Sequence, residues 1–236
     1  MKKILYSVAL AACCMGTMTS CSDFLDASNK SNVTAKQSFA TKEGLNNLVN
    51  NAYQHLQNVY AAPLFTSCFS AGTDMYADAR NKMNEALNTY ETLTPENTDI
   101  KNLYTYLYSG IRAANSVSYY AQTAQVDEKT KGQLVGEARV LAAYEYYLLV
   151  NNFGGVPIMK DFLTTADTGY PKSSSEDVYA YIISELEEVI SKNVLQASTA
   201  TKGGGRISQE TAKAILAKTY LSAAWDLNNQ DYFAKA

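Results

Sequence analysis

Apolar side chains recur at intervals of three and four residues along five separate stretches of this 236-residue chain. This spacing places them on one face of an α-helix, because a helix turns once every ~3.6 residues. No stretch shows the convincing alternation of apolar and polar residues that a half-buried β-strand requires. The pattern therefore predicts an all-α fold of antiparallel helix pairs. The five apolar sets lie within residues 45–59, 103–121, 134–149, 178–190 and 212–223.

Helix-end signals flank several of these stretches. Thr41 and Ser208 are placed to cap the first and fifth helices. Gly154 and Gly155, followed by Pro157, are typical of a helix C-terminus, and we predict positive φ for at least one of these glycines. The helix spacing and Ala-rich faces suggest tetratricopeptide-like pairs, whose repeat is about 34 residues.

Residues 1–20 have the layout of a secretory signal, with Lys2 and Lys3 followed by an apolar stretch and then small or polar residues. The residues before Cys21 resemble a bacterial lipobox, which predicts that Cys21 is acylated and becomes the first residue of the mature chain. Cys13 is the alternative anchor: the residues before it match a lipobox more closely, but they leave a shorter apolar core. We favour Cys21, with residues 21–40 as a tether and the acyl chains as the membrane anchor.

Composition excludes several function classes. The chain carries 20 Lys and Arg against 23 Asp and Glu, with no long basic run, so we expect no nucleic-acid partner. It contains one His and one Trp, which leaves little material for His-based metal or catalytic sites. We expect no metal, no cofactor and no enzymatic activity. With Cys21 acylated, Cys68 remains alone, and we expect a buried structural residue because no basic neighbour would lower its thiol pKa.

The last residues, 227–236, read as the opening of another helix cut in its second turn. A helical solenoid requires a polar capping helix at each end. We therefore expect residues 41–236 to form a truncated helical domain.

Three stretches carry a resemblance to a known family. They read Cys-Ser-Asp-Phe-Leu-Asp at residues 21–26, Gly-Glu-Ala-Arg-Val-Leu-Ala-Ala-Tyr-Glu-Tyr-Tyr-Leu-Leu-Val-Asn-Asn-Phe-Gly-Gly-Val-Pro at 136–157, and Arg-Ile-Ser at 206–208 followed by Ala-Lys-Ala-Ile-Leu-Ala-Lys-Thr-Tyr-Leu at 212–221. They resemble the N-terminal portion of the SusD/RagB outer-membrane lipoproteins of Bacteroidetes. The middle stretch is the most specific of the three.

The resemblance implies a SusD-like α-fold of four tetratricopeptide-like helix pairs that pack against a transporter, with glycan held on the opposite, loop-rich side. It implies a lipoprotein anchored in the outer membrane and facing the cell exterior. Its role would be to bind a poly- or oligosaccharide and deliver it to a SusC-type TonB-dependent transporter.

Residues 65–91 form the candidate ligand loop, because they join two predicted helices over more residues than a simple connection needs. Sugars require aromatic faces for their C–H groups and planar amide, carboxylate or guanidinium groups for their hydroxyls. The candidate contact residues are Asp74, Tyr76, Asp78, Arg80 and Asn81. A solvated loop in which these residues only form turns is the alternative.

Other conspicuous residues are interpreted as structural. We expect the helical tyrosines within residues 104–120 and 144–147 to pack between helices, and His55 to serve surface or packing roles instead of binding a metal. Glu185, Glu187 and Glu188 are expected on a solvated helix face. Residues 203–206, Gly-Gly-Gly-Arg, are expected to form a flexible joint, since they lack a phosphate loop's flanking elements.

Two functional hypotheses remain. The first is a surface lipoprotein that binds nutrient glycan and passes it to a porin. The second is an exported tetratricopeptide-like scaffold that binds only proteins, or a non-functional fragment. Retardation in a polysaccharide gel separates the first from the second.

Overall fold

The computed structural model of this chain describes residues 34–61, 63–76, 85–165, 169–198 and 205–236. Two compact units are distinguished, Met1–Ala35 and Lys36–Ala236, and of the first only Thr34 and Ala35 are among the described residues. The predicted signal sequence, Cys13 and Cys21 lie outside the described residues. No helix in the described ranges is both long and apolar enough to cross a membrane.

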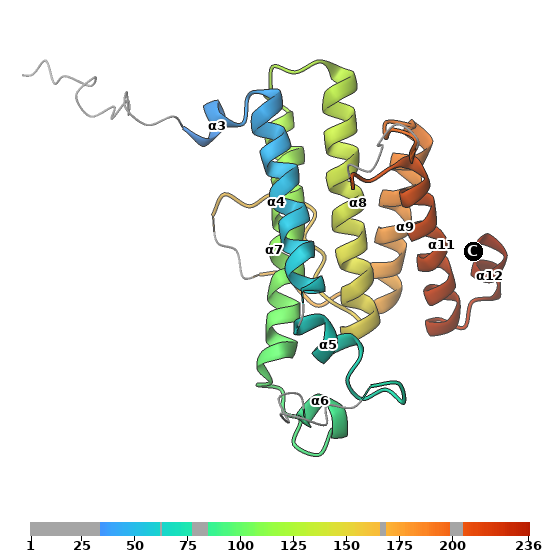
Figure 1. Cartoon of the computed structure of the whole chain (residues 1–236). Helices are drawn as coiled ribbons and strands as arrows, with labels where there is room; N and C mark the ends of the chain where they lie inside the picture. Colours follow the sequence, from blue (N-terminus) through green and yellow to red (C-terminus); the bar gives the residue numbers. More distant parts are fainter. Residues whose placement is uncertain (1–33, 62, 77–84, 166–168, 199–204) are drawn as a thin grey trace, which may run out of the picture. The chain divides into compact units, whose positions relative to one another are not determined.

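Helices are the regular elements of the described residues, and no strand occurs among them (Figure 1). Five long helices follow one another along the chain, each packing against the next in an up-and-down arrangement. Four short helices accompany them within the described ranges. The long helices are α4 (Lys42–Tyr60), α7 (Thr98–Ala121), α8 (Glu128–Phe153), α9 (Ser175–Lys192) and α11 (Gln209–Asp226), and the short ones are α3 (Ala35–Ser38), α5 (Leu64–Phe69), α6 (Glu85–Thr89) and α12 (Gln230–Lys235).

The five helices predicted from apolar spacing are all present, and their apolar stripes form one core. Buried residues from every long helix contribute to this core, among them Leu45, Ile111, Leu141, Ile182 and Ala212. The predicted caps are also confirmed. The Thr41 hydroxyl accepts a hydrogen bond from the Gly44 amide (3.1 Å), and the Ser208 hydroxyl accepts one from the Thr211 amide (3.1 Å).

The double glycine at the end of α8 turns the chain sharply. Gly154 has φ 68° and ψ −135°, so the predicted positive φ is confirmed, in a region that side chains other than glycine rarely adopt. A Cβ at Gly155 would collide with the backbone carbonyl of Ser173. The pair therefore lets the chain leave α8 and pass close to the segment that leads into α9.

The tyrosines of α7 and α8 pack as predicted, with one exception. Tyr146 is fully buried, and Tyr104, Tyr108 and Tyr147 are half-buried against the core. Tyr119 is 43% exposed. These aromatic side chains fill the space between helices and form no continuous exposed platform.

The acidic side chains of α9 refine an expectation: Glu187 and Glu188 are exposed, as predicted, and Glu185 is partly buried. Glu185 and Glu188 are not simply solvated, because both accept hydrogen bonds from the Arg139 guanidinium on α8, at 2.7 and 2.6 Å. Glu187 accepts a hydrogen bond from the Tyr220 hydroxyl on α11 (2.6 Å). Pairing with side chains of the neighbouring helices, which helical periodicity cannot reveal, links these carboxylates to α8 and α11.

Arg206 corrects a second expectation, since this part of the predicted flexible joint is anchored. Its guanidinium forms an ion pair with the buried carboxylate of Glu137 (2.7 Å) and donates hydrogen bonds to Asn46 and Asn50 of α4. The ring of Tyr53 lies beneath it, with the guanidinium carbon 5.6 Å from the ring centroid. Arg206, three residues before the start of α11, is therefore held against α4 and α8.

Candidate functional site

The predicted ligand segment, residues 65–91, contains the short helices α5 and α6 instead of one continuous loop. Asp74 is exposed and Tyr76 is half-buried. Asp78, Arg80 and Asn81 lie outside the described residues. The role of these five residues in ligand binding therefore stays a prediction.

A pocket of about 320 Å³ is lined by residues of this segment together with residues of α7 and α8. Cys68, on its wall, is half-buried and packs against the core, as predicted for a structural cysteine. Burial, with a smaller contribution from the Asp99 carboxylate, raises the pKa of the Cys68 thiol to about 11. The thiol is therefore protonated near neutral pH and is a poor nucleophile.

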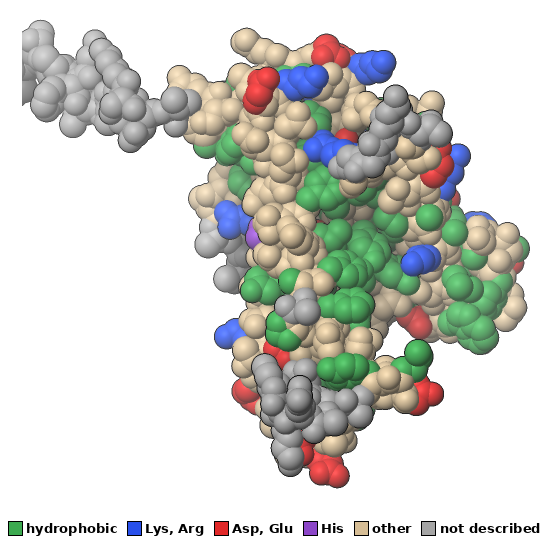
Figure 2. Space-filling model, in the orientation of Figure 1, with side chains coloured by type: hydrophobic (Ala, Val, Ile, Leu, Met, Phe, Trp, Pro, Cys, Tyr) green, Lys and Arg blue, Asp and Glu red, His purple; other side chains and the backbone are tan. Residues whose placement is uncertain are grey.

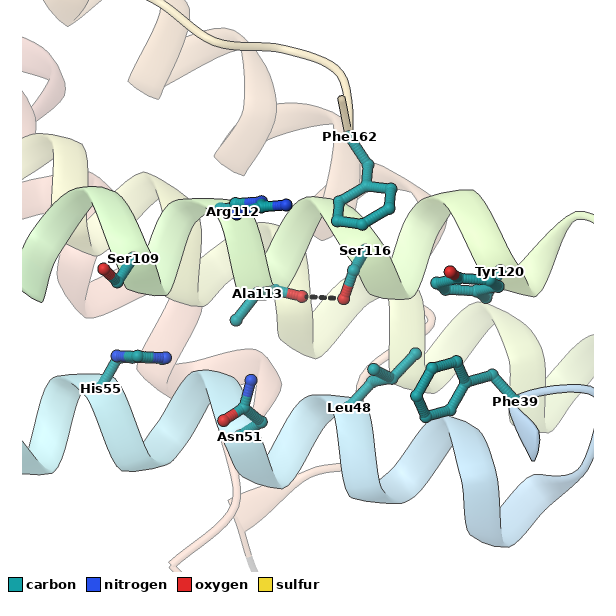
Figure 3. Close-up of a pocket in the computed structure, with 10 residues that line it drawn as sticks. All are labelled: Phe39, Leu48, Asn51, His55, Ser109, Arg112, Ala113, Ser116, Tyr120 and Phe162. Atoms are coloured by element: carbon teal, nitrogen blue, oxygen red, sulfur yellow. Dashed lines mark hydrogen bonds between the residues drawn. The ribbon is translucent and has the colours of Figure 1, made fainter. Parts of the chain in front are cut away.

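A second pocket, of about 380 Å³, lies between α4 and α7 and combines aromatic with polar groups (Figure 3). In the close-up, α4 and α7 run side by side with the pocket residues between them, and Phe162 enters from a separate segment. We name this site the α4–α7 pocket. Its lining residues are Phe39, Leu48, Asn51, His55, Ser109, Arg112, Ala113, Ser116, Tyr120 and Phe162.

Three aromatic rings gather at one end of the α4–α7 pocket. The ring centroids of Phe39 and Tyr120 are 4.8 Å apart, and those of Tyr120 and Phe162 are 5.8 Å apart. Such tilted ring pairs pack favourably beyond the area that they bury. This end of the pocket offers apolar faces to a ligand.

The turn before α4 places Phe39. Gly44, in the first turn of α4, lies so close to the Ser38 carbonyl that a Cβ there would collide with it. The Ala40 carbonyl accepts a hydrogen bond from the Gln125 amide, just beyond α7 (2.8 Å). The absent glycine side chain and this hydrogen bond hold the turn, and with it Phe39, against the end of α7.

The segment that follows the double glycine places Phe162. The Asn115 side-chain amide on α7 donates to the Met159 carbonyl (2.8 Å), and the Met159 amide donates to the Tyr146 hydroxyl on α8 (2.7 Å). These hydrogen bonds hold the segment against α7 and α8 at Met159, three residues before Phe162. The turn at the end of α8 thus supplies one wall of a pocket formed by two other helices.

Polar groups occupy the other end of the α4–α7 pocket. The Arg112 guanidinium carbon lies 5.7 Å from the Phe162 ring centroid. His55 is half-buried, and burial lowers the pKa of its imidazole, so the ring is neutral near pH 7. Its Nδ1 atom is buried without a hydrogen-bond partner in the described structure. Asn51 and Ser109 add an amide and a hydroxyl to the same end (Figure 3).

The groups that line the α4–α7 pocket are better suited to binding a ligand than to catalysing a reaction. Aromatic faces can lie against the C–H face of a sugar ring, and an amide, a hydroxyl and a guanidinium can bond its polar groups. Within the described ranges, no group of three or more His, Cys, Asp and Glu side chains is placed to hold a metal ion.

Sequence reasoning did not identify the α4–α7 pocket. From the sequence, His55 is expected to be a surface or packing residue and Tyr120 a packing residue, and no role is predicted for Arg112 or Phe162. A signal was nevertheless available, because positions 48, 51 and 55 on α4 and positions 109, 112, 116 and 120 on α7 each follow helical spacing. What the sequence lacks is any indication that these two faces meet.

Comparisons with known proteins agree on one family. A SusD-like family model, described as starch-binding and associating with the outer membrane, matches residues 23–221. The chain is 29% identical over 139 residues to a SusD-like protein of Bacteroides ovatus, a match covering 57% of this chain and 24% of that protein.

Solved structures share the fold. Surface glycan-binding protein A from Bacteroides uniformis matches with a TM-score of 0.68 and 24% identity, over 82% of this chain and 44% of that one. A laminarin-binding SusD-like protein matches with a TM-score of 0.67 and 23% identity, over 80% and 41%. This chain therefore spans less than half the length of each of these relatives.

Proposed function

The chain belongs to the SusD-like family, whose members are starch-binding and associate with the outer membrane, and on that premise we propose that it is a cell-surface lipoprotein that binds a nutrient glycan. In this proposal it delivers the bound oligosaccharide to a SusC-type TonB-dependent transporter in the outer membrane. The proposal assigns binding and no catalysis to the chain.

The α4–α7 pocket is the observation that carries the binding part of this proposal. It joins three aromatic rings to an amide, a hydroxyl, an imidazole and a guanidinium within about 380 Å³, a volume in the usual range of small-molecule sites. Carbohydrate recognition requires this combination, because a pyranose presents both apolar C–H faces and hydroxyl groups.

Affinity electrophoresis of the purified chain tests the binding proposal. We expect starch or another polysaccharide in the gel to retard the chain, and Phe162→Ala to reduce the retardation, because that substitution removes one wall of the pocket. Phe233→Ala, which removes the same ring far from the pocket, serves as the matched control. Equal mobility with and without every polysaccharide tested would contradict the proposal.

A protein-binding scaffold is the second candidate function, and the apolar surface of α11 and α12 favours it. Trp225 is 72% exposed, Leu221 is 46% exposed, and the Trp225 ring contacts that of Phe233 (5.1 Å between centroids). Hydrophobic side chains gather over this part of the molecule (Figure 2). Exposed apolar patches of this kind mark protein interaction sites. Under the scaffold hypothesis, Trp225→Ser removes partner binding and polysaccharide leaves mobility unchanged.

The anchor proposal rests on Cys21. In this proposal, acylation of Cys21 tethers the helical domain to the outer membrane with its folded part facing the cell exterior. Cys21→Ser is expected to prevent incorporation of radiolabelled palmitate and to release the chain from the membrane fraction, whereas Cys13→Ser leaves both unchanged. Labelling that survives in Cys21→Ser and disappears in Cys13→Ser would move the anchor to Cys13.

A further inference from the structure

The charge balance of the α4–α7 pocket differs from that of the chain as a whole. The chain carries more acidic than basic residues, 23 against 20. Among the ten described residues that line the pocket, Arg112 carries a formal charge and no Asp or Glu is present. The pocket is therefore locally positive in a protein that is negative overall.

The Arg112 guanidinium is also free of an acidic partner within the described part of the chain. No carboxylate oxygen there comes within 4.0 Å of it. Arg112 borders a neighbouring pocket of about 260 Å³ together with Asp161, but the two residues form no ion pair. An arginine without a partner beside a pocket can offer its in-plane N–H groups to a ligand.

Another pocket of the same protein shows the contrast. The pocket between α7, α8 and α9, of about 300 Å³, contains Arg139 and Lys160 but also Glu185 and Glu188. Arg139 there is engaged by both glutamates, at 2.7 and 2.6 Å. In that pocket Arg139 is held by carboxylates of the fold, whereas Arg112 is left available.

We propose that the α4–α7 pocket binds an acidic sugar residue, with Arg112 pairing with its carboxylate and the aromatic end holding its C–H face. This inference rests on the proposed glycan-binding function and narrows its ligand to uronate-containing glycans. A guanidinium binds a carboxylate through two parallel hydrogen bonds, which gives strength and orientation together. Phe162, which contacts both the guanidinium and the aromatic cluster, fixes the distance between the two halves of the site.

The polar groups opposite Arg112 fit the remainder of such a sugar. The neutral imidazole of His55 and the amide of Asn51 can exchange hydrogen bonds with ring hydroxyls without adding charge. Ser116 keeps acceptor capacity, since its hydroxyl already donates to the Ala113 carbonyl (2.6 Å). A carboxylate is thus the ligand group that complements the formally charged residue among those lining this pocket.

Calorimetry with a matched ligand pair tests the proposal. Trigalacturonate and its fully methyl-esterified form share one carbon skeleton and differ in the charged carboxylates. We expect the purified chain to bind the acid form at least about tenfold more tightly than the ester, the effect of one charge-assisted pair. Arg112→Gln should weaken binding of the acid form about tenfold and leave ester binding unchanged.

Two further variants separate charge at the site from charge in general. Lys101→Gln removes the same charge from an exposed position on the same helix, and we expect it to leave both affinities unchanged. Phe162→Ala should weaken both ligands. Circular dichroism confirms that each variant is folded.

The outcomes distinguish this inference from the function on which it rests. Equal binding of acid and ester, insensitive to Arg112→Gln but lost in Phe162→Ala, would overturn the acidic ligand and leave glycan binding standing. Equal losses of acid binding in Arg112→Gln and Lys101→Gln would overturn the specific role of Arg112. Failure of the folded chain to bind either ligand or any neutral glycan would overturn both proposals.

Discussion

Two glutamates of α8, Glu137 and Glu145, are both fully buried but have opposite surroundings. Glu137 receives the Arg206 guanidinium (2.7 Å), the Tyr53 hydroxyl (3.2 Å) and the Gln133 side-chain amide (3.2 Å). Neither carboxyl oxygen of Glu145 has a hydrogen-bond partner among the described residues. The two residues lie eight positions apart, or about 12 Å along the helix axis.

The difference shows that burial alone does not decide what a carboxyl group does in a core. Glu137 is the centre of a network that joins α4, α8 and the residues before α11. Glu145 faces Gly110 on α7, where the missing side chain leaves room for the carboxyl group. Desolvation raises the pKa of Glu145 well above its usual value, so it is held in the neutral form.

The largest expected effect comes from removing the cation that Glu137 needs. Arg206→Met leaves a buried carboxylate without its counter-charge, and we expect a loss of about 3–5 kcal/mol in the free energy of unfolding. Urea denaturation followed by circular dichroism measures it.

Two controls sharpen this prediction. Adding Glu137→Met to Arg206→Met should restore most of the loss, because an apolar pair can replace a buried ion pair. Arg139→Met, which breaks the more exposed pairs with Glu185 and Glu188, should cost less. A loss below about 1 kcal/mol in Arg206→Met would remove the contrast between the two glutamates.

Replacing Glu145 is expected to raise the free energy of unfolding, whereas replacing Arg206 is expected to lower it. Glu145→Leu replaces an unsatisfied polar group by an apolar side chain in an apolar setting, and we expect a gain of about 1–3 kcal/mol at pH 7. The same denaturation experiment measures it. Destabilisation by Glu145→Leu would mean that the carboxyl group has a partner or a packing role that its surroundings do not reveal.

The pH dependence of stability follows from the raised pKa of Glu145. The folded state holds this proton at pH values where the unfolded chain, with a carboxyl pKa of 4.5, has released it. Stability from this group is therefore complete below pH 4.5 and is lost as pH rises toward the folded pKa. Comparing the urea midpoints of the wild type and Glu145→Leu between pH 4.5 and 8 should show the difference widening with pH.

The smallest effect concerns Gly110, the residue that makes room for Glu145. A Cβ at this position would collide with the Glu145 carboxyl group, so we expect Gly110→Ala to destabilise by about 1 kcal/mol, after its gain in helix propensity is counted. In a Glu145→Ala background the same change should stabilise by about 0.5–1 kcal/mol.

Gly132 of α8 provides the matched control for Gly110→Ala. A Cβ there meets Val194 at an ordinary 3.4 Å, so Gly132→Ala should stabilise in either background. Equal effects of Gly110→Ala with and without Glu145 would show that the two residues do not share this space.

Most of the fold was predictable because helices depend on local sequence patterns, namely the spacing of apolar residues and the residues at the helix ends. Apolar spacing located the five long helices, and Thr41, Ser208 and the Gly154-Gly155 pair marked ends that the structure confirms. Periodicity also held a clue to Glu145, since positions 141, 145 and 148 continue the buried stripe of α8. It could not show that Glu145 lacks a partner.

Long-range pairing was not predictable, for a physical reason. Arg206 is separated from Glu137 by most of α8 and all of α9, and its glycine-rich neighbours indicated a flexible joint instead. The α4–α7 pocket likewise depends on two helix faces meeting and on Phe162 arriving from a third segment. Of the predicted ligand residues, Asp74 and Tyr76 remain candidates, and Asp78, Arg80 and Asn81 lie outside the described residues.

The fastening of Arg206 to α4 changes how this stack of helices comes apart. In an open solenoid each repeat contacts only its neighbours, so the ends can unravel independently. Here Arg206 reaches Asn46 and Asn50, 160 and 156 positions away in sequence, and the Ile207 amide donates to the Tyr53 hydroxyl (2.8 Å). These contacts close the stack at one point by tying the segment before α11 to α4, so that this segment cannot leave without breaking contacts of the first long helix. Native-state hydrogen exchange should then report α4 and α11 opening as one cooperative unit, and the high contact order of this closure should make it a late step in folding.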